Sequence, residues 1–269
     1  MVVQSVLGLP FQGQYRDVEW IRATWSGNDW VTLVAAVPLL VVALVLARRG
    51  STRGLLLWLG MLGYAVYNYA YYLFGAALNA FFPLYVVALV LPVVALILLL
   101  SRTDVAGVAA TFRSKAPVRI IGGYLAFVGI GLGSVWLIMW AAYAFAGRPT
   151  PIEPEAFKLV AALDTSIMAT VLTFGGVLLC RRNAWGYIVA VIAGIQGSLY
   201  LLVLSVNSSV AIHRGLAEAP GELPVWGMLA VLTTTATVLL LTNVRGERGS
   251  ARVSYKRDRN SRDTGYPRS

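Results

Sequence analysis

Seven long apolar stretches dominate this chain, and each is long enough to cross a lipid bilayer. A bilayer core about 30 Å thick needs about 20 helical residues. The stretches are Val31–Ala47, Gly54–Leu78, Phe81–Leu100, Ile120–Ala146, Leu159–Cys180, Ala184–Val206 and Leu223–Val244. Lipid offers the backbone no hydrogen-bond partner, so a spanning segment satisfies its own peptide groups as a helix. The sequence therefore predicts an all-α membrane protein, a seven-transmembrane helix bundle covering residues 30–244.

The composition agrees with a membrane protein. The chain is 58% hydrophobic and only 13% charged, whereas soluble domains contain about 25% charged residues. Residues 1–29 precede the first stretch and carry Phe11, Tyr15, Trp20 and Trp25. Tyrosine and tryptophan favour the headgroup zone of a bilayer. We therefore expect residues 1–29 to form an extracytoplasmic or interfacial lead-in.

Basic residues alternate between the two sides of the predicted bundle. The loops after the first, third and fifth stretches, together with the segment after the seventh, contain 17 basic residues and four acids. The rest of the chain contains five basic residues and eight acids. Because loops rich in arginine and lysine stay in the cytoplasm, the amino terminus is expected outside and the carboxyl terminus in the cytoplasm. The expected location is the plasma membrane, and the net charge of +10 reflects this asymmetry rather than nucleic-acid binding.

Residues 245–269 form a basic, polar segment with few large aliphatic side chains. This composition is typical of a disordered tail. One interpretation is binding to anionic lipid headgroups, at about 1 kcal/mol per basic residue near the surface. The other is a segment that only fixes the orientation of the chain and keeps it soluble.

Two parts of the chain are similar to each other. Arg48-Arg49 and Arg181-Arg182 each end an apolar stretch, and Trp58 and Trp185 lie near the start of the stretch that returns. If the similarity extends further, stretches one to three match stretches five to seven, with the fourth as a linker. This 3+1+3 plan is a parallel repeat, which in transporters often places the substrate site at the repeat interface. The alternative is that topology alone requires both arginine pairs.

A resemblance to a known group rests on two sets of residues. The first is Asp164 with the run Arg181-Arg182-Asn-Ala-Trp-Gly-Tyr187, and the second is the tyrosine-rich run from Tyr64 to Asn79. Together they resemble bacterial membrane proteins without an assigned activity. The resemblance implies the same topology, and the excess of arginine over lysine is typical of a GC-rich bacterial genome.

Polar residues inside the apolar stretches are the candidate ligand-binding residues. Asp164 lies well inside the fifth stretch, where an acid costs several kcal/mol unless it has a partner, water or a proton. Tyr64, Asn68 and Tyr71 share one face of the second stretch, because residues three and four apart are neighbours on a helix. Gln196 lies near the middle of the sixth stretch. The alternatives are a structural acid bonded to tyrosine hydroxyls, aromatic packing, and a helix–helix hydrogen bond.

No motif for catalysis, metal binding or a cofactor occurs in the sequence, and an enzyme is not expected. His213 lacks a ligand-like spacing to the outer acids and is interpreted as part of a solvated loop. Cys180, the single cysteine, excludes an intrachain disulfide. Gly129 and Gly133 have the GxxxG spacing of close helix packing, either within the bundle or in a homo-oligomer.

These patterns support one main hypothesis and an alternative. The main hypothesis is an integral membrane protein that binds or transports a small molecule or lipid through an outward-facing polar and aromatic pocket. In it Asp164 carries charge or a proton. The alternative is a non-catalytic structural or accessory subunit of a larger membrane complex. An enzyme at the outer face, using Glu153, Asp164 and His213, ranks third.

Overall fold

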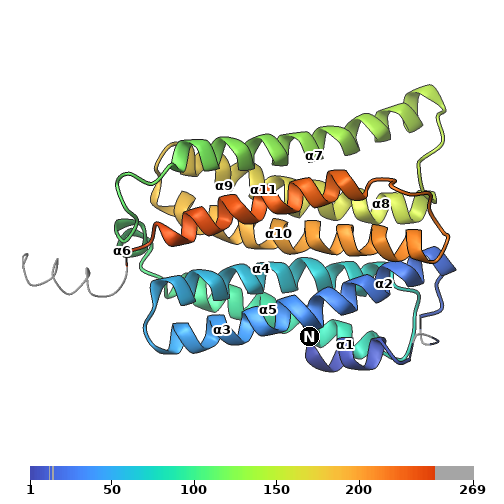
Figure 1. Cartoon of the computed structure of the whole chain (residues 1–269), viewed down its shortest axis with the longest axis horizontal. Helices are drawn as coiled ribbons and strands as arrows, with labels where there is room; N and C mark the ends of the chain where they lie inside the picture. Colours follow the sequence, from blue (N-terminus) through green and yellow to red (C-terminus); the bar gives the residue numbers. More distant parts are fainter. Residues whose placement is uncertain (12, 14, 246–269) are drawn as a thin grey trace, which may run out of the picture.

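A computed structural model describes residues 1–11, 13 and 15–245, which fold into a bundle of roughly aligned helices (Figure 1). The helices are α1 (Val2–Gly8), α2 (Glu19–Val31), α3 (Val37–Arg48), α4 (Thr52–Gly75), α5 (Phe82–Ser101), α6 (Val105–Ala110), α7 (Val118–Ala146), α8 (Pro154–Leu163), α9 (Thr170–Cys180), α10 (Ala184–His213) and α11 (Leu223–Thr242). Two π-helical segments join neighbouring helices: η2 (Thr32–Ala36) between α2 and α3, and η3 (Asp164–Ala169) between α8 and α9. The predicted basic tail lies outside the described residues, apart from Arg245.

Within the described residues, six helical stretches are long and apolar enough to span a membrane: Glu19–Arg48, Phe82–Ser101, Val118–Ala146, Pro154–Cys180, Ala184–His213 and Leu223–Thr242. Their outer faces expose large apolar side chains, among them Leu91, Phe127 and Val231. An apolar surface of this extent requires lipid rather than water. The chain is therefore an integral, multi-pass membrane protein.

The first spanning helix begins earlier than the sequence indicates. It starts at Glu19 instead of Val31 and runs through η2 to Arg48. The polar residues between these positions do not all face outward, because Asn28 and Asp29 are buried inside the bundle. The polarity that made residues 1–29 look like a lead-in thus comes partly from side chains that bond within the protein.

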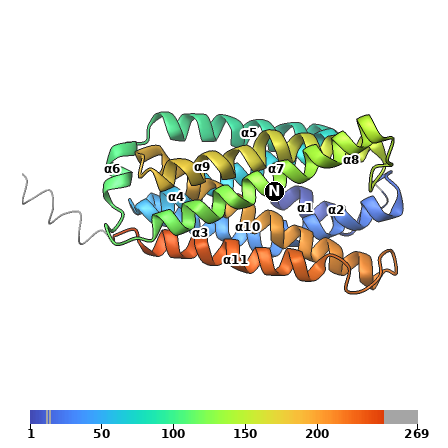
Figure 2. The same cartoon turned by 90° about the horizontal axis from the view of Figure 1, so that it is seen from above.

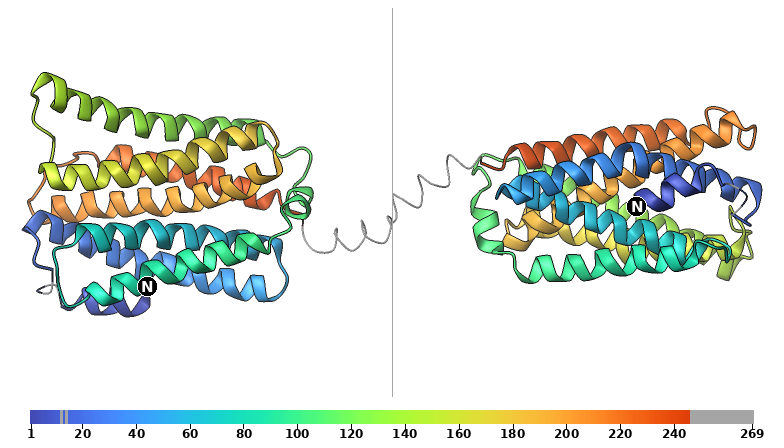
Figure 3. Two further views of the ribbon diagram at one scale, coloured as in Figure 1. Left: turned by 180° about the vertical axis from the view of Figure 1, so that it is seen from behind. Right: turned by 90° about the horizontal axis from the view of Figure 1, so that it is seen from below.

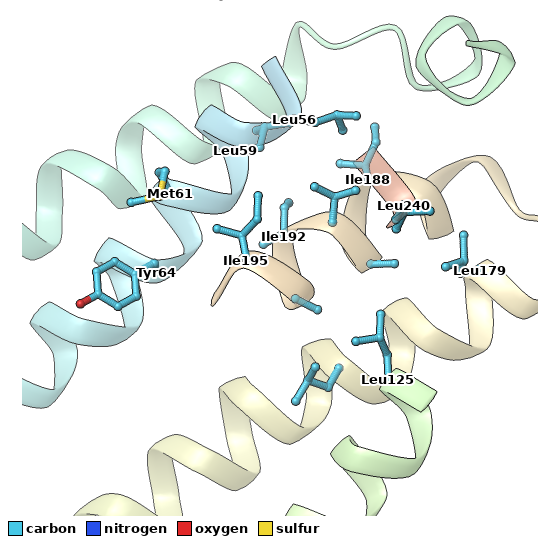
Figure 4. Packing of buried hydrophobic residues seen from close by; sticks show 14 of the residues in the cluster. Leu56, Leu59, Met61, Tyr64, Leu125, Leu179, Ile188, Ile192, Ile195 and Leu240 are labelled. Carbon is cyan, nitrogen blue, oxygen red and sulfur yellow. The ribbon is translucent and has the colours of Figure 1, made fainter. Parts of the chain in front are cut away.

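The core surrounds α10, which packs against α4, α9, α11 and α2. Ile188, Ile192 and Ile195 of α10 lie among leucines of the neighbouring helices (Figure 4). Leu56 and Leu59 come from α4, Leu179 from α9 and Leu240 from α11. Burial of each such side chain is worth about 1.5–3 kcal/mol where the alternative is water. Between lipid-embedded helices, close packing supplies the stabilisation instead.

The arginine-rich turns gather at one end of the bundle, here called the basic end (Figures 2 and 3). It contains the turn after α3, the loop with α6, the turn after α9 and the end of α11. Arg53 donates from Nη2 to the carbonyl oxygen of Val244 at 2.5 Å, and the backbone nitrogen of Arg113 donates to Asn243 O at 2.9 Å. Helices α4 and α10 both start at this end, and therefore run in the same direction side by side.

The turns before α4 and α10 have the same backbone geometry. Gly50 and Arg182 both have positive φ, at 78° and 54°. The next residues, Ser51 and Asn183, cap α4 and α10 with their side chains. Their backbone nitrogens donate to the carbonyl oxygens of Leu46 and Leu178 at 3.1 and 3.0 Å.

Glycines make the same close approach after both turns. A Cβ atom at Gly54 would collide with the backbone of Leu46 and Ala47, and one at Gly186 with that of Leu178 and Leu179. In each matched pair, the residue of the second turn lies 132 positions after its counterpart in the first turn. The first residues of η2 and η3 are also 132 positions apart. This register is one residue away from the sequence match that placed Arg48-Arg49 opposite Arg181-Arg182.

Candidate functional site

Asp164 is completely buried, at 0% exposed, and accepts three hydrogen bonds. The Tyr67 hydroxyl donates to Oδ1 through a very short contact. The Tyr200 hydroxyl and the Trp136 indole Nε1 both donate to Oδ2 at 2.9 Å. The three donors come from α4, α10 and α7, so one carboxylate joins three helices to the chain segment that carries it.

Local structure places Asp164 at this junction. It is the first residue of η3, where the helix departs from α-helical hydrogen bonding. Side-chain hydroxyls satisfy carbonyl groups around this segment: Thr165 donates to Ala161 O at 2.6 Å, and Thr170 to Thr165 O at 2.9 Å. Short π-helical segments often occur at functional sites.

The tyrosines meet where α4 and α10 cross. The rings of Tyr67 and Tyr200 contact edge to face, with centroids 5.2 Å apart. The helices come close because glycines of α4 face isoleucines of α10. A Cβ atom at Gly60 would collide with Ile195, and one at Gly63 would lie 2.8 Å from Cγ2 of Ile192.

Asp164 has no cationic partner among the described residues. The ion pair in the described part of the chain joins Lys158 and Glu155 at the surface, at 3.2 Å, and no arginine, lysine or histidine of that part pairs with Asp164. A buried ionised carboxylate without a counter-charge loses several kcal/mol of hydration. Three neutral donors offset part of that loss, and protonation of the carboxylate would remove it.

The other four predicted site residues lie near α4 and α10 but do not hydrogen-bond to Asp164. The Tyr64 hydroxyl pairs with Thr32 Oγ1 at 3.2 Å, and the Tyr71 ring packs against Trp25 at 4.9 Å. Asn68 and Gln196 are both buried, and within the described structure their side-chain nitrogens have no hydrogen-bond partner.

Sequence reasoning selected Asp164 but missed its strongest contacts. Tyr67 lies in the tyrosine-rich run from Tyr64 to Asn79 but was not chosen, and Tyr200 and Trp136 were not chosen either. The available signal was the helical spacing of Tyr67 between Tyr64 and Tyr71. Trp136 had no signal, because an isolated tryptophan in an apolar helix is ordinarily a lipid-facing residue.

A second buried carboxylate, Asp29, was also missed. It is 0% exposed and accepts hydrogen bonds from Gln4 Nε2 at 2.7 Å, Tyr15 OH at 2.8 Å and Tyr72 OH at 2.9 Å. Like Asp164, it has no cationic partner within residues 1–11, 13 and 15–245. The described part of the chain thus contains two buried acids, each held by two tyrosine hydroxyls and one further donor.

A cavity of about 340 Å³, which neither acid lines, lies toward the end opposite the basic end. It is lined by Ser26, Trp30, Val206, Ser209, Val210, His213 and Arg214. None of the five predicted site residues borders it. His213, interpreted as part of a solvated loop, therefore lies at the edge of this cavity between α2 and α10.

The described residues contain no group of three or more histidine, cysteine or acidic side chains placed to hold a metal ion. Cys180 is unpaired, and its Sγ lies 3.4 Å from the Arg119 carbonyl oxygen. No protein-family model, curated protein or solved structure matches this chain. The resemblance to bacterial membrane proteins without an assigned activity therefore stays a prediction.

Proposed function

We propose that the chain crosses the bilayer seven times, with the basic end in the cytoplasm and α4 as the seventh span. Helix α4 has 24 residues, enough for a bilayer core about 30 Å thick. Its tyrosines, glycines and Asn68 lower its hydropathy, but most of them are buried against other helices. The excess of arginine at the basic end supports this orientation, and we place the protein in the plasma membrane of a bacterium.

We propose further that α2–α5 and α8–α11 are parallel repeats joined by α7. The matching turns at Gly50 and Arg182 support this proposal, since every matched pair lies 132 residues apart. The same register relates the two contacts of Gly60 with Ile195 and Gly63 with Ile192. Gly60 is equivalent to Ile192 in this register, and Gly63 is equivalent to Ile195. The two contacts therefore exchange with each other under the two-fold axis that would relate the repeats.

The proposed function is proton-dependent binding or transport of a small polar molecule through a site at Asp164. The supporting observation is a carboxylate at 0% exposure that is bonded to three neutral donors and, among the described residues, to no cation. The site contains one tyrosine from each proposed repeat, Tyr67 from α4 and Tyr200 from α10. It is closed to solvent, so the outward-facing pocket of the sequence hypothesis requires a second arrangement of the helices.

Proton binding to Asp164 would be coupled to opening of the site, because burial of an ionised carboxylate is unfavourable. In the closed arrangement Asp164 has no counter-charge, so its neutral form fits best. On opening, water replaces the tyrosine hydroxyls and stabilises the ionised form. The open state would therefore release the proton and present a carboxylate to a cationic or hydrogen-bond-donating ligand.

Infrared spectroscopy of the protein in nanodiscs tests the proton site without knowledge of the ligand. Aspartate labelled with ¹³C at the side-chain carboxyl separates these groups from glutamate. We expect a protonated-carboxyl band at neutral pH that persists in Asp29→Asn and is lost when Asp164→Asn is added to that variant, so that any contribution of Asp29 is removed first. A spectrum in which Asp164 absorbs as an ionised carboxylate at every pH where the protein is folded would contradict the proposal.

Native mass spectrometry of gently extracted protein then addresses the ligand. A bound small mass that disappears in Asp164→Asn but persists in Asp29→Asn would identify what the site holds. Retention of that mass in Asp164→Asn would place the ligand elsewhere, with the cavity beside His213 as the first place to examine.

The packing of α7 bears on the alternative hypothesis, an accessory subunit of a larger membrane complex. Gly129 faces the backbone of Ala169 and Thr173, and Gly133 lies near the Ala169 Cβ. The GxxxG face of α7 is therefore packed within the protein rather than free for a partner. A complex would have to form through other surfaces, and partner chains that co-purify in fixed ratio with the unmodified protein would support the accessory-subunit alternative.

A further inference from the structure

Helix α1 turns back into the bundle beside α2. It begins near the middle of the bundle's length and runs toward the end opposite the basic end, where the chain turns into α2 (Figures 1 and 2). Val2, Val3 and Val6 point outward, whereas Gln4, Ser5 and Gly8 are buried. A non-spanning helix at this depth is tolerated where its polar groups face protein.

Both polar atoms of the Gln4 side chain form hydrogen bonds. Its Nε2 donates to Asp29 Oδ1 at 2.7 Å and to the Tyr15 hydroxyl at 3.2 Å. Its Oε1 accepts from the Tyr69 hydroxyl at 3.3 Å and from Ser5 Oγ at 3.4 Å. Gln4 itself is 0% exposed, so its amide is enclosed as a bound ligand would be.

The groups around this amide belong mostly to the rest of the bundle. Asp29 lies on α2, and Tyr69 and Tyr72 on α4. Tyr15 donates to Asp29 Oδ2 at 2.8 Å; burial and the negative charge of Asp29 raise the pKa of the Tyr15 phenol above its ordinary value, which keeps that proton in place. Its oxygen remains an acceptor for the Gln4 amide.

The resulting set of groups is complementary to a primary carboxamide. Two acceptors, the Asp29 carboxylate and the Tyr15 oxygen, meet the two N–H bonds, and one donor, the Tyr69 hydroxyl, meets the carbonyl. A carboxylic acid anion would place an oxygen against Asp29 and be repelled. An alkylammonium would leave the Tyr69 hydroxyl without an acceptor.

Helix α1 is held mainly through this polar cluster. It has seven residues and packs against α2 and η2, while its three valines, Val2, Val3 and Val6, face outward. At Gly8 a Cβ atom would collide with the Asp29 carboxylate and lie 2.6 Å from the Tyr15 hydroxyl. Helices this short have little stability of their own.

We propose that Asp29, Tyr15, Tyr69 and Tyr72 form a binding site for a small primary carboxamide, and that α1 is a removable plug whose Gln4 amide occupies this site. A free carboxamide of similar size competes with Gln4 and stabilises the arrangement in which α1 has withdrawn. The site lies in the first half of the chain and goes beyond the Asp164 function proposed above; either can hold without the other.

Chemical rescue with propionamide, which has the shape of the glutamine side chain, tests the site. The variant Gln4→Gly removes the internal amide and is expected to lower the midpoint of thermal unfolding. Propionamide should raise that midpoint in a concentration-dependent manner, whereas N,N-dimethylpropionamide, which lacks the N–H bonds, should not. Val3→Gly is the matched control, because it introduces the same backbone freedom at an exposed position of α1 and keeps Gln4.

Accessibility of Ser5 tests the plug with Gln4 intact. In a cysteine-free background, Ser5→Cys places a thiol at a position that is 0% exposed. Propionamide should increase its rate of maleimide labelling several-fold, and the dimethyl analogue should not. Unchanged labelling would overturn the removable plug. A Gln4→Gly response that is absent, or that is the same with the dimethyl analogue, would overturn the carboxamide site.

Discussion

Replacement of Asp164 by leucine and by asparagine separates the structural from the chemical role of the buried carboxylate. Leucine has a similar volume but accepts no hydrogen bond, so Tyr67, Tyr200 and Trp136 all lose their acceptor. Asparagine keeps one oxygen. That oxygen can face the Trp136 indole, which only donates, while the new amide group faces the amphoteric hydroxyl of Tyr67.

The expected magnitudes follow from the burial of each donor. An orphaned buried donor costs about 1–3 kcal/mol. Tyr67 is fully buried, whereas Tyr200 and Trp136 are half-buried and fall at the low end of that range. Asp164→Leu, which orphans all three donors, should therefore lower the free energy of unfolding by about 3–5 kcal/mol. Asp164→Asn loses one favourable contact and should cost about 1 kcal/mol.

Equilibrium unfolding in a mixed-micelle titration with a denaturing detergent measures this difference. Ser166→Leu, at an exposed position two residues away, controls for the introduction of leucine into η3 and should be close to neutral. The reasoning would be refuted if Asp164→Leu were as stable as Asp164→Asn, since the three donors would then have other partners.

Three further predictions concern the turns, the helix crossing and the orientation. Gly63→Leu should destabilise the protein by about 1–3 kcal/mol or more through overpacking against α10, whereas Gly131→Leu, with open space around it, should be tolerated in the same unfolding assay. Arg182→Gly should raise stability by about 1 kcal/mol, because glycine adopts the observed positive φ without strain; a lower midpoint would show that the arginine side chain matters more than the backbone. In intact cells with cysteine-free background, a membrane-impermeant maleimide should label Glu155→Cys and not Ser51→Cys, and the reverse pattern would invert the proposed topology.

The sequence predicted the positions of the helices well because the length of an apolar run is a direct consequence of bilayer thickness. The second to seventh predicted stretches begin or end within a few residues of α4, α5, α7, α9, α10 and α11. The six spanning helices agree with a polytopic protein. α4, which we propose as the seventh span, has a lower hydropathy, since a helix surrounded by protein can replace leucine with tyrosine and glycine.

The polar clusters were only partly predictable. An acid within an apolar run marks Asp164, but its donors depend on how α7 and α10 pack, which no local pattern encodes. Asp29 was hidden for another reason: it follows polar residues, and Asn28 and Asp29 look like the end of a solvated segment. The burial of Asp29 depends on donors such as Gln4 and Tyr72, which lie 25 and 43 positions away in the chain.

The π-helical segments give this protein two places where the chain carries one residue more than a regular helix would. Deletion of a residue inside a transmembrane α-helix rotates everything beyond it by about 100° and shortens it by about 1.5 Å. Deletion of Thr165 within η3 would instead let the segment relax to α-helical bonding, with α8 and α9 still presenting their present faces. Length changes in a lineage of such proteins should thus accumulate at η2 and η3, where the helix can gain or lose a residue without repacking the bundle.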